Sequence, residues 1–183
     1  MQKQYYRAVF ESNIEFLRGP KQKQSLNNVA MQLRMACNHP WTIQGVEQKM
    51  MDDLKIDEHD IDAQMEKLMQ LSGKFVLLDK LLAKLQKQGS KVLIFSQFVL
   101  LLDLLEDFLN WRRYKYERID GSTAGRFRQQ AIDRYSKPGS DRFVFMLSTR
   151  AGQTRTQREY AHLIRPVLTL LCLLFFCHRW LRN

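Results

Sequence analysis

Short apolar runs alternate with amphipathic segments between residues 92 and 147, and this alternation restricts the fold more than any other feature of the sequence. Residues 92–95 (Val-Leu-Ile-Phe) are continuously apolar, which is typical of a strand buried on both faces of a sheet. Further strands are predicted over 116–119 and 143–147, and helices over 99–111 and 124–136. Strands separated by helices of this length predict right-handed βαβ units. The predicted fold class is therefore α/β, with a parallel sheet.

Helices are expected before this sheet. Apolar residues recur at helical spacing over 4–17, 26–37 and 73–87. Between residues 47 and 66, eight acidic side chains stand against two lysines, so this stretch is predicted to be a flexible or loosely helical connector. The expected organisation is a helical segment over 1–46, an acidic connector over 47–71, a partial α/β lobe over 72–152 and a separate tail over 153–183.

A polar loop directly follows each predicted strand. These loops are Ser96 and Gln97, then Asp120, Gly121 and Ser122, then Ser148, Thr149 and Arg150. Because ligands bind at the carboxyl ends of parallel strands, the three loops are predicted to share one edge of the sheet. Hydroxyls, backbone amides and an arginine are groups that commonly contact the sugar-phosphate backbone of nucleic acid. The alternative is ordinary loop and helix-cap chemistry, for which the same residue types are preferred.

The basic charge of the chain favours an anionic partner. The formal net charge is +10, and between residues 112 and 165 thirteen basic side chains stand against five acidic ones. Most of the excess positive charge therefore belongs to the half of the sequence that carries the polar loops. This charge favours binding to the phosphate backbone of nucleic acid. A solvated basic surface without a partner is the alternative.

The cysteines do not predict a metal site. Cys37, Cys172 and Cys177 lack a second Cys-x-x-Cys half, so they are interpreted as reduced thiols and no metal ligand is assigned.

Four stretches carry a family resemblance. They are residues 2–6 (Gln-Lys-Gln-Tyr-Tyr), residues 33–40 (Leu-Arg-Met-Ala-Cys-Asn-His-Pro), residues 72–74 leading into 91–98, and residues 118–122 with Arg126, Arg128 and Ala131, followed by 147–152. Together they resemble the C-terminal lobe of SWI/SNF-type chromatin-remodelling ATPases of helicase superfamily two, and they are most similar to the imitation-switch and chromodomain-helicase branches. The resemblance covers residues 1–152 and ends within the opening of motif V.

The resemblance implies an incomplete RecA-like lobe that works with a first motor lobe, in the nucleus, to translocate along duplex DNA and shift nucleosomes. Ser96 and Gln97 correspond to motif IV. Asp120, Gly121 and Ser122, with Ser148, Thr149 and Arg150, would face the DNA backbone. ATP and Mg²⁺ are the cofactors of the complete family enzyme, and no small-molecule substrate of this lobe is implied.

The chain departs from the family pattern in its nucleotide site. Gly152 is followed by Gln-Thr-Arg-Thr-Gln-Arg, whereas the family continues with Gly-Leu-Gly-Ile-Asn-Leu and later supplies an arginine finger. No phosphate-binding Gly-x-x-x-x-Gly-Lys-[Ser/Thr] loop is present, and residues 57–60 (Asp-Glu-His-Asp) imitate the Mg²⁺-binding motif without the buried strand that precedes a genuine one. No catalytic residue is assigned, and the chain alone is expected not to hydrolyse ATP.

The tail carries an almost wholly apolar run over residues 167–177. It is shorter than the roughly 20 residues that span a bilayer, so a buried helix, a strand or an interfacial segment remain open and a membrane partner is not expected. A shifted reading frame or a retained intron would produce such an abrupt boundary. A sheet without the strands that follow motif V would keep an open edge, unless residues 163–176 cover it.

Two alternative functions remain for the chain. One is a non-catalytic or dominant-negative nucleic-acid-binding module, and the other is a membrane-associated protein that uses the apolar run of its tail.

Overall fold

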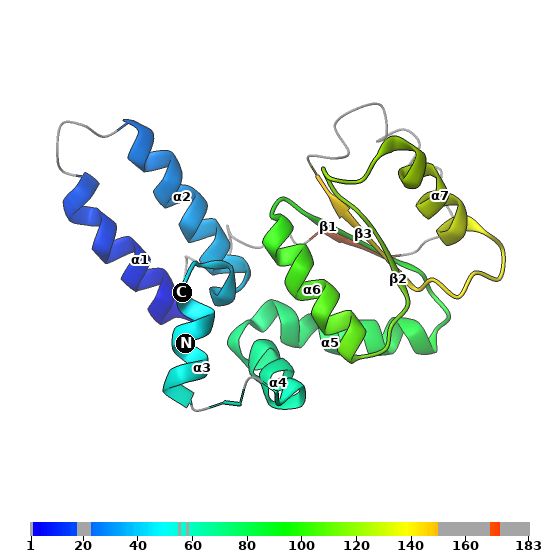
Figure 1. Ribbon diagram of the computed structural model, residues 1–183, viewed down its shortest axis with the longest axis horizontal. Coiled ribbons are helices and arrows are strands. Elements are labelled where there is room, and N and C mark those ends of the chain that lie inside the picture. Colours follow the sequence, from blue (N-terminus) through cyan, green and yellow to red (C-terminus); the bar gives the residue numbers. More distant parts are fainter. Residues whose placement is uncertain (1, 18–22, 55, 58, 150–168, 173–183) are drawn as a thin grey trace. The chain divides into compact units, whose positions relative to one another are not determined.

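The computed structural model describes residues 2–17, 23–54, 56–57, 59–149 and 169–172 (Figure 1). The chain forms two compact units, Met1–Leu77 and Leu78–Asn183. None of the helices in the described residues combines the length and the apolar character needed to cross a bilayer.

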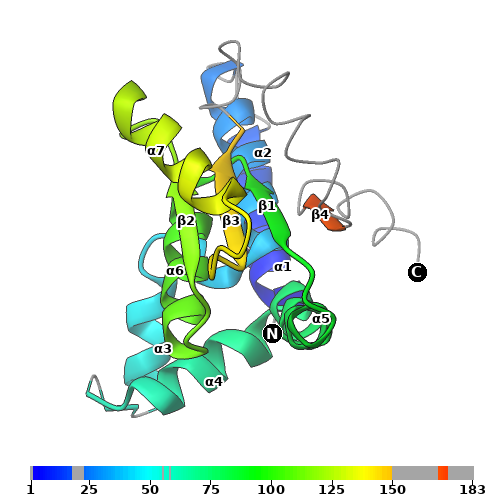
Figure 2. The same ribbon diagram turned by 90° about the vertical axis from the view of Figure 1, so that its right-hand side faces the viewer.

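The second unit is the α/β part that the alternating pattern predicts. Its elements are β1 (Val92–Ser96), α6 (Val99–Trp111), β2 (Tyr116–Ile119), α7 (Gly125–Ser136), β3 (Val144–Ser148) and β4 (Thr169–Cys172). The strands are parallel and lie in the order β2-β3-β1-β4. The chain moves from β1 to β2 in one direction and from β2 back to β3 in the other. Right-handed crossovers therefore place α6 and α7 on opposite faces of the sheet (Figure 2).

The core of this unit follows from the strand alternation. Leu93, Phe145 and Leu147 pack with Ala131 and Tyr135 of α7 in one buried cluster. Val92, Ile94 and Met146 are also fully buried, and because successive side chains point to opposite faces, they face away from α7. A strand buried on both faces must be apolar throughout, which explains the run that predicted β1.

β4 comes from the apolar tail run. Residues 169–172 pair with β1 in the register Val92↔Thr169 to Phe95↔Cys172. Of the three possibilities for this run, the strand is therefore the one that the structure contains at residues 169–172, and the rest of the run lies outside the described residues. β1 is thus paired on both sides, with β3 and with β4.

The first unit is helical. It contains α1 (Gln2–Leu17), α2 (Lys23–Asn38), a 3-10 turn η1 (Pro40–Thr42), α3 (Val46–Leu54), α4 (Ile61–Leu71) and the first residues of α5 (Gly73–Lys87). α1 and α2 contact each other, and the Gln2 side chain donates to the carbonyl oxygens of Ala36 (3.0 Å) and Cys37 (2.9 Å). Those carbonyls end α2 and have no partner within the helix, so Gln2 caps them.

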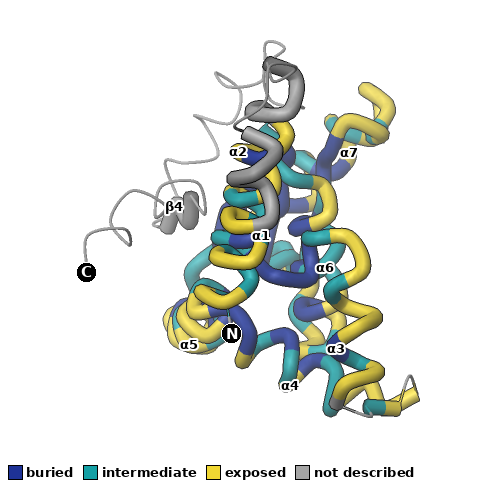
Figure 3. The backbone as a smooth tube through the Cα atoms, turned by 90° about the vertical axis from the view of Figure 1, so that its left-hand side faces the viewer, coloured by how far each residue is buried: buried dark blue, intermediate teal, exposed yellow. Residues whose placement is uncertain are grey.

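The acidic stretch is more ordered than its composition predicts. α3 and α4 occupy it, with Met50, Met65, Leu68 and Leu71 buried. The last three recur every three residues, so they line one face of α4, while the carboxylates lie on exposed positions. Figure 3 shows buried and exposed residues alternating along α4 and α5, as amphipathic helices require.

His39 joins the elements of the first unit. Its side chain is fully buried; Nδ1 accepts from the Trp41 N–H (3.1 Å), and Nε2 lies 2.9 Å from the Leu68 carbonyl oxygen. This arrangement requires a neutral ring with the proton on Nε2. Burial lowers the pKa of His39 to about 4, although the bond to the Leu68 carbonyl opposes the shift. The ring also packs edge-on against Phe75.

Asn38 brings together two stretches that carried the family resemblance. Its backbone carbonyl accepts from the Ser72 hydroxyl (2.8 Å), and its side-chain oxygen accepts from the Lys74 ammonium (2.6 Å). Residues 33–40 and 72–74 are therefore one structural joint of the first unit, and their polar groups are used within it.

Candidate nucleic-acid interface

The predicted polar loops share one edge of the sheet. Ser96 pairs with Ser148 and Ile119 with Leu147, so β1, β3 and β2 end side by side. The Thr149 N–H then donates to the Ser96 carbonyl (2.9 Å) beyond the last strand pair. We call this edge, formed by residues 96–98, 120–123 and 148–149, the rim. Arg150 lies outside the described residues, and the other seven predicted site residues all lie on the rim.

Ser96 shapes the first rim loop. Its side chain is buried, and its hydroxyl donates to the Phe98 carbonyl (2.9 Å) and accepts from the Phe98 N–H (3.1 Å). This local pairing turns the chain from β1 into α6 and leaves Gln97 partly exposed. Ser96 therefore positions the loop, and Gln97 is the side chain that the loop presents.

Asp120 organises the second rim loop from inside. Its carboxylate accepts from the Ser122 N–H (2.9 Å) and the Ser122 hydroxyl (2.5 Å), while the Asp120 N–H donates to the Thr123 hydroxyl (3.2 Å). The Ser122 hydrogen bonds, and the neighbouring Arg118, hold the pKa of Asp120 below its usual range against the opposing effect of burial. A buried anion does not attract a phosphate, so Asp120 shapes the loop while Gly121 and Ser122 are exposed.

Two arginines fix this loop to the rest of the unit. Arg128, in the first turns of α7, donates from Nε to the Thr123 carbonyl (2.9 Å) and from Nη2 to the Asp120 carbonyl (3.3 Å). Arg118 forms ion pairs with Asp120 (2.9 Å), Asp103 (2.6 Å) and Glu106. Sequence reasoning assigned no site role to either arginine, although both belong to the stretch that resembles the family. Asp103 and Glu106, which pair with Arg118, lie on α6, so no local pattern could have shown its role. Arg128 bonds to carbonyls of the loop just before its own helix, so its role is local.

The third rim loop follows β3. Ser148 is buried and Thr149 is partly exposed. Within the described part of the chain, the Thr149 hydroxyl and the Gly121 N–H have no hydrogen-bond partner. The rim can offer these two donors to an anion.

The charge of the rim differs from the sequence-based expectation. Around it, Arg118, Arg126 and Arg128 stand against the carboxylates of Asp103, Glu106 and Asp120. The described rim is therefore close to neutral, and the basic excess of this half of the sequence lies elsewhere in the unit. In the described residues, no group of three His, Cys, Asp or Glu side chains is arranged to hold a metal ion.

A parallel α/β unit with polar loops on the carboxyl edge of its strands is the architecture of a RecA-like helicase lobe. Residues 73–154 match the family model for the helicase conserved C-terminal domain. Residues 73–154 therefore belong to the helicase conserved C-terminal domain family.

Relatives are similar over most of the chain. It is 52% identical over 158 residues to chromodomain-helicase-DNA-binding protein 7 of Homo sapiens, and 54% identical over 158 residues to chromodomain-helicase-DNA-binding protein 6 of Homo sapiens. Each alignment covers 83% of this chain, whereas the chain spans only 5% and 6% of the length of these relatives.

Solved structures share the fold. The Sulfolobus solfataricus SWI2/SNF2 ATPase C-terminal domain superposes with a TM-score of 0.62 at 20% identity, covering 80% of this chain and 57% of that one. The Sulfolobus solfataricus SWI2/SNF2 ATPase core in complex with dsDNA superposes with a TM-score of 0.57 at 19% identity, covering 81% of this chain and 28% of that one. At these identities the likeness establishes the fold alone.

Proposed function

We propose that the chain is part of the second motor lobe of a DNA-dependent ATPase that remodels nucleosomes in the nucleus, and that its rim contacts the DNA backbone. The observation that carries this proposal is the convergence of Gln97, Gly121 and Thr149 on one edge of a helicase-family lobe, where Gly121 is exposed and the other two are partly exposed. The relatives are named as DNA-binding helicases, and a structure of the same fold is a complex with duplex DNA.

The rim suits contact with a phosphate backbone because its loops are held in place before binding. The Asp120 carboxylate and the Arg128 guanidinium hold the loop through its own backbone, so the exposed Gly121 N–H is presented without reorganisation. Backbone amides and hydroxyls bind phosphate oxygens without reading base sequence. Such contacts suit a motor that moves along DNA of any sequence.

In this proposal each segment of the chain has its own role in a larger enzyme. Residues 72–152 supply the DNA-facing lobe, residues 1–46 join it to the first motor lobe, residues 47–71 connect the two, and residues 153–183 lie outside the family pattern. ATP and Mg²⁺ act in the complete enzyme, and this chain alone does not hydrolyse ATP.

Replacing Thr149 with glutamate is expected to weaken duplex binding by roughly tenfold or more, because a carboxylate would replace a donor at the phosphate-contacting edge. Fluorescence anisotropy with a labelled duplex measures the dissociation constant. Gln48→Glu, which adds the same charge at an exposed position of α3, is the matched control. Equal affinity of Thr149→Glu and Gln48→Glu would contradict the proposed interface. Wild-type binding should weaken steeply with salt.

A further inference from the structure

The basic residues of the second unit gather at the edge of the sheet opposite to the rim. The strands are parallel and Val92, Val144 and Tyr116 lie side by side at their starts. α5, α6 and α7 each end where the chain turns into β1, β2 and β3 respectively. The last turns of these helices and the connections that follow them therefore share one edge, which we call the amino edge.

The amino edge carries nine cationic side chains against five carboxylates. The cations are Lys84, Lys87, Lys91, Arg112, Arg113, Lys115, Arg134, Lys137 and Arg142, and the carboxylates are Asp79, Asp107, Glu117, Asp133 and Asp141.

Ion pairs account for four of the cations. Arg112 pairs with Asp79, Arg134 and Arg142 share Glu117, and Lys115 pairs with Asp141. The other five have no carboxylate partner among the described residues.

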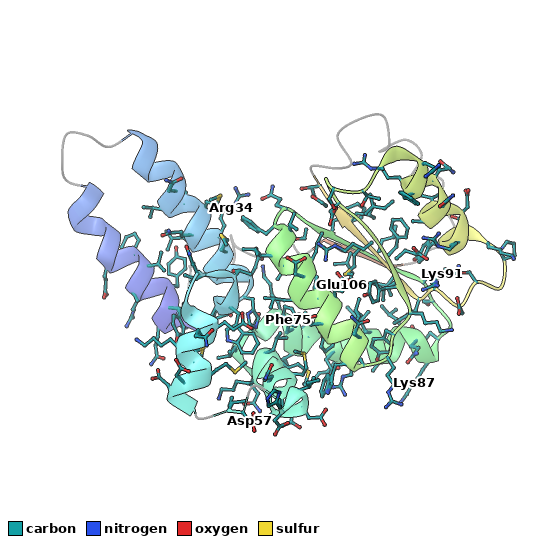
Figure 4. The ribbon with its side chains drawn as sticks, viewed as in Figure 1. Arg34, Asp57, Phe75, Lys87, Lys91 and Glu106 are labelled. Atoms are coloured by element: carbon teal, nitrogen blue, oxygen red, sulfur yellow. The ribbon has the colours of Figure 1, made fainter. Side chains whose placement is uncertain are left out.

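One of these five has an internal role. The Lys91 ammonium donates to the Tyr135 carbonyl oxygen and lies 4.9 Å from the centre of the Tyr135 ring (Figure 4). It is partly buried, and burial lowers the pKa of Lys91. Lys91 therefore fastens α7 to the start of β1. Lys84, Lys87, Arg113 and Lys137 remain as exposed cations at the amino edge.

Helix ends explain only part of this charge. Each helix C-terminus carries a partial charge of about −0.5, so three helices favour between one and two cations at this edge. An excess of four positive charges is at least twice what the helix ends require. Like charges at this density repel one another, and a polyanion would relieve that repulsion.

Arg113 is a second, independent sign of function at this edge. It has φ 58°, in the left-handed region, and ends α6 through the bonds Arg113 N–H to Asn110 O and Tyr114 N–H to Leu109 O. α5 ends in the same way, with Gly89 (φ 66°) at the equivalent position. Glycine is the usual residue there because a side chain is strained in this conformation. An arginine at the equivalent turn of α6 keeps a cation at the amino edge in spite of that strain.

We propose that the amino edge binds the phosphate backbone of duplex nucleic acid at a site separate from the rim. Exposed cations from three different helix ends form a broad positive surface, which suits a regular polyanion that carries about one charge per 1.7 Å. The choice of nucleic acid as the polyanion rests on the proposed function. The surface itself follows from the charges and from the turn at Arg113.

The test compares two sets of three substitutions in the 183-residue chain. The amino-edge variant carries Lys87→Gln, Arg113→Gly and Lys137→Gln. The control variant carries Lys3→Gln, Arg7→Gln and Lys49→Gln, which remove the same charge from exposed positions of the first unit. Anisotropy over a range of salt concentrations is expected to show that the slope of log K against log salt falls by about 2–3 in the amino-edge variant, since each phosphate contact contributes about 0.9. The control should change little.

Arg113→Gly alone separates binding from folding. Removing the strained side chain is expected to raise Tm by roughly 4 °C, while the affinity for duplex falls. A variant that lost affinity through misfolding would show a lower Tm. An unchanged affinity of Arg113→Gly, or equal losses in the amino-edge and control variants, would overturn the proposal.

The experiments test the two proposed DNA-binding sites, the rim and the amino edge, independently of each other. If Thr149→Glu weakens binding and the amino-edge variant does not, the rim stands and the amino edge is refuted. The reverse result leaves the amino edge and removes the rim. Polyglutamate at equal charge concentration should compete poorly against duplex. Competition as strong as that of unlabelled duplex would overturn nucleic acid as the ligand.

Discussion

Replacing His39 with alanine is expected to lower the free energy of unfolding of the helical unit by about 3–5 kcal/mol. The imidazole is fully buried, so its removal leaves a cavity beside Phe75. It also leaves the Trp41 N–H and the Leu68 carbonyl without their partner. An unsatisfied buried group costs about 1–3 kcal/mol, and the loss is a large fraction of the stability of a small domain.

Urea denaturation followed by far-UV circular dichroism measures this loss, with His59→Ala as the matched control. His59 is exposed, and the hydrogen bonds that the described residues give it use its backbone: its N–H donates to Asp57 (2.9 Å), and its carbonyl oxygen accepts from the Ile61 N–H (3.2 Å). Its replacement is therefore expected to change the free energy of unfolding by no more than about 0.5 kcal/mol. Similar losses in the two variants would mean that His39 does not hold the helices together.

The stability of the same unit is expected to fall as the pH is lowered from about 6.5 to 4. The pKa of His39 is about 4 in the folded chain and about 6.5 in the unfolded chain. Between these pH values the unfolded chain therefore binds one more proton than the folded chain, which favours unfolding. The full contribution is present above pH 6.5, and about 3 kcal/mol of it is lost by pH 4.

Denaturation of the wild type and of His39→Ala at a series of pH values isolates this effect. The stability difference between them should shrink toward pH 4. Asp120 and Asp141, whose pKa values are lowered by their hydrogen-bond partners, also lose their stabilising contribution as the pH falls, but they are present in both variants and cancel in the difference. A constant difference between pH 7 and pH 4 would contradict a neutral buried His39.

The second large effect is expected at Arg118. Replacing it with methionine keeps much of its volume but leaves Asp103, Glu106 and Asp120 facing one another without the guanidinium. Removing one partner of a fully buried ion pair costs about 3–5 kcal/mol. The Arg118 side chain is 18% exposed and that of Asp103 47%, so solvent screening reduces the expected loss to about 2 kcal/mol.

The Arg118 prediction is checked by adding Glu106→Gln to Arg118→Met. Removing one of the three carboxylates should recover part of the stability, because the loss arises from their repulsion. The same double variant keeps Asp120 and its contacts to Ser122. If the double variant is no more stable than Arg118→Met alone, the loss does not come from repulsion between the carboxylates. Arg118 would then stabilise the unit through packing.

The sequence predicts the α/β unit well because its strands are buried on both faces. Val92 to Ile94 are almost fully inaccessible, so they must be apolar, and the run is visible without any knowledge of the fold. α6 occupies residues 99–111 as predicted, and β3 is displaced by one residue from the expected range. The parallel arrangement follows from the helices between the strands.

The acidic stretch shows where such reasoning stops. Composition averages over all faces of a segment, so the carboxylates of residues 47–66 obscured the buried positions Met50 and Met65. The periodic apolar residues of α4 were present in the sequence, but charge content outweighed them in the prediction.

The positions of charges in space could not be predicted from their positions in the sequence. Residues 112–165 are strongly basic, yet the helix-to-strand turns of the described part send Arg113 and Lys137 to the edge opposite the predicted loops. The same limit applies to the rim: Asp120 has the residue type of a polar binding loop, but its carboxylate points into that loop. The hydrogen-bond partners in the folded structure show whether a polar side chain is available to a ligand or is used to hold a loop in place.

The strand order has a consequence for how the sheet can assemble as the chain is synthesised. β1 leaves the ribosome before both of its neighbours, and β4 follows it by more than 70 residues. Until then one edge of the β1 backbone is without its partner strand, and pairing between residues so distant in sequence is slow. We expect a nascent chain with such an unpaired strand to bind chaperones. A pause in translation before residue 172 would prolong the exposure of the unpaired edge of β1.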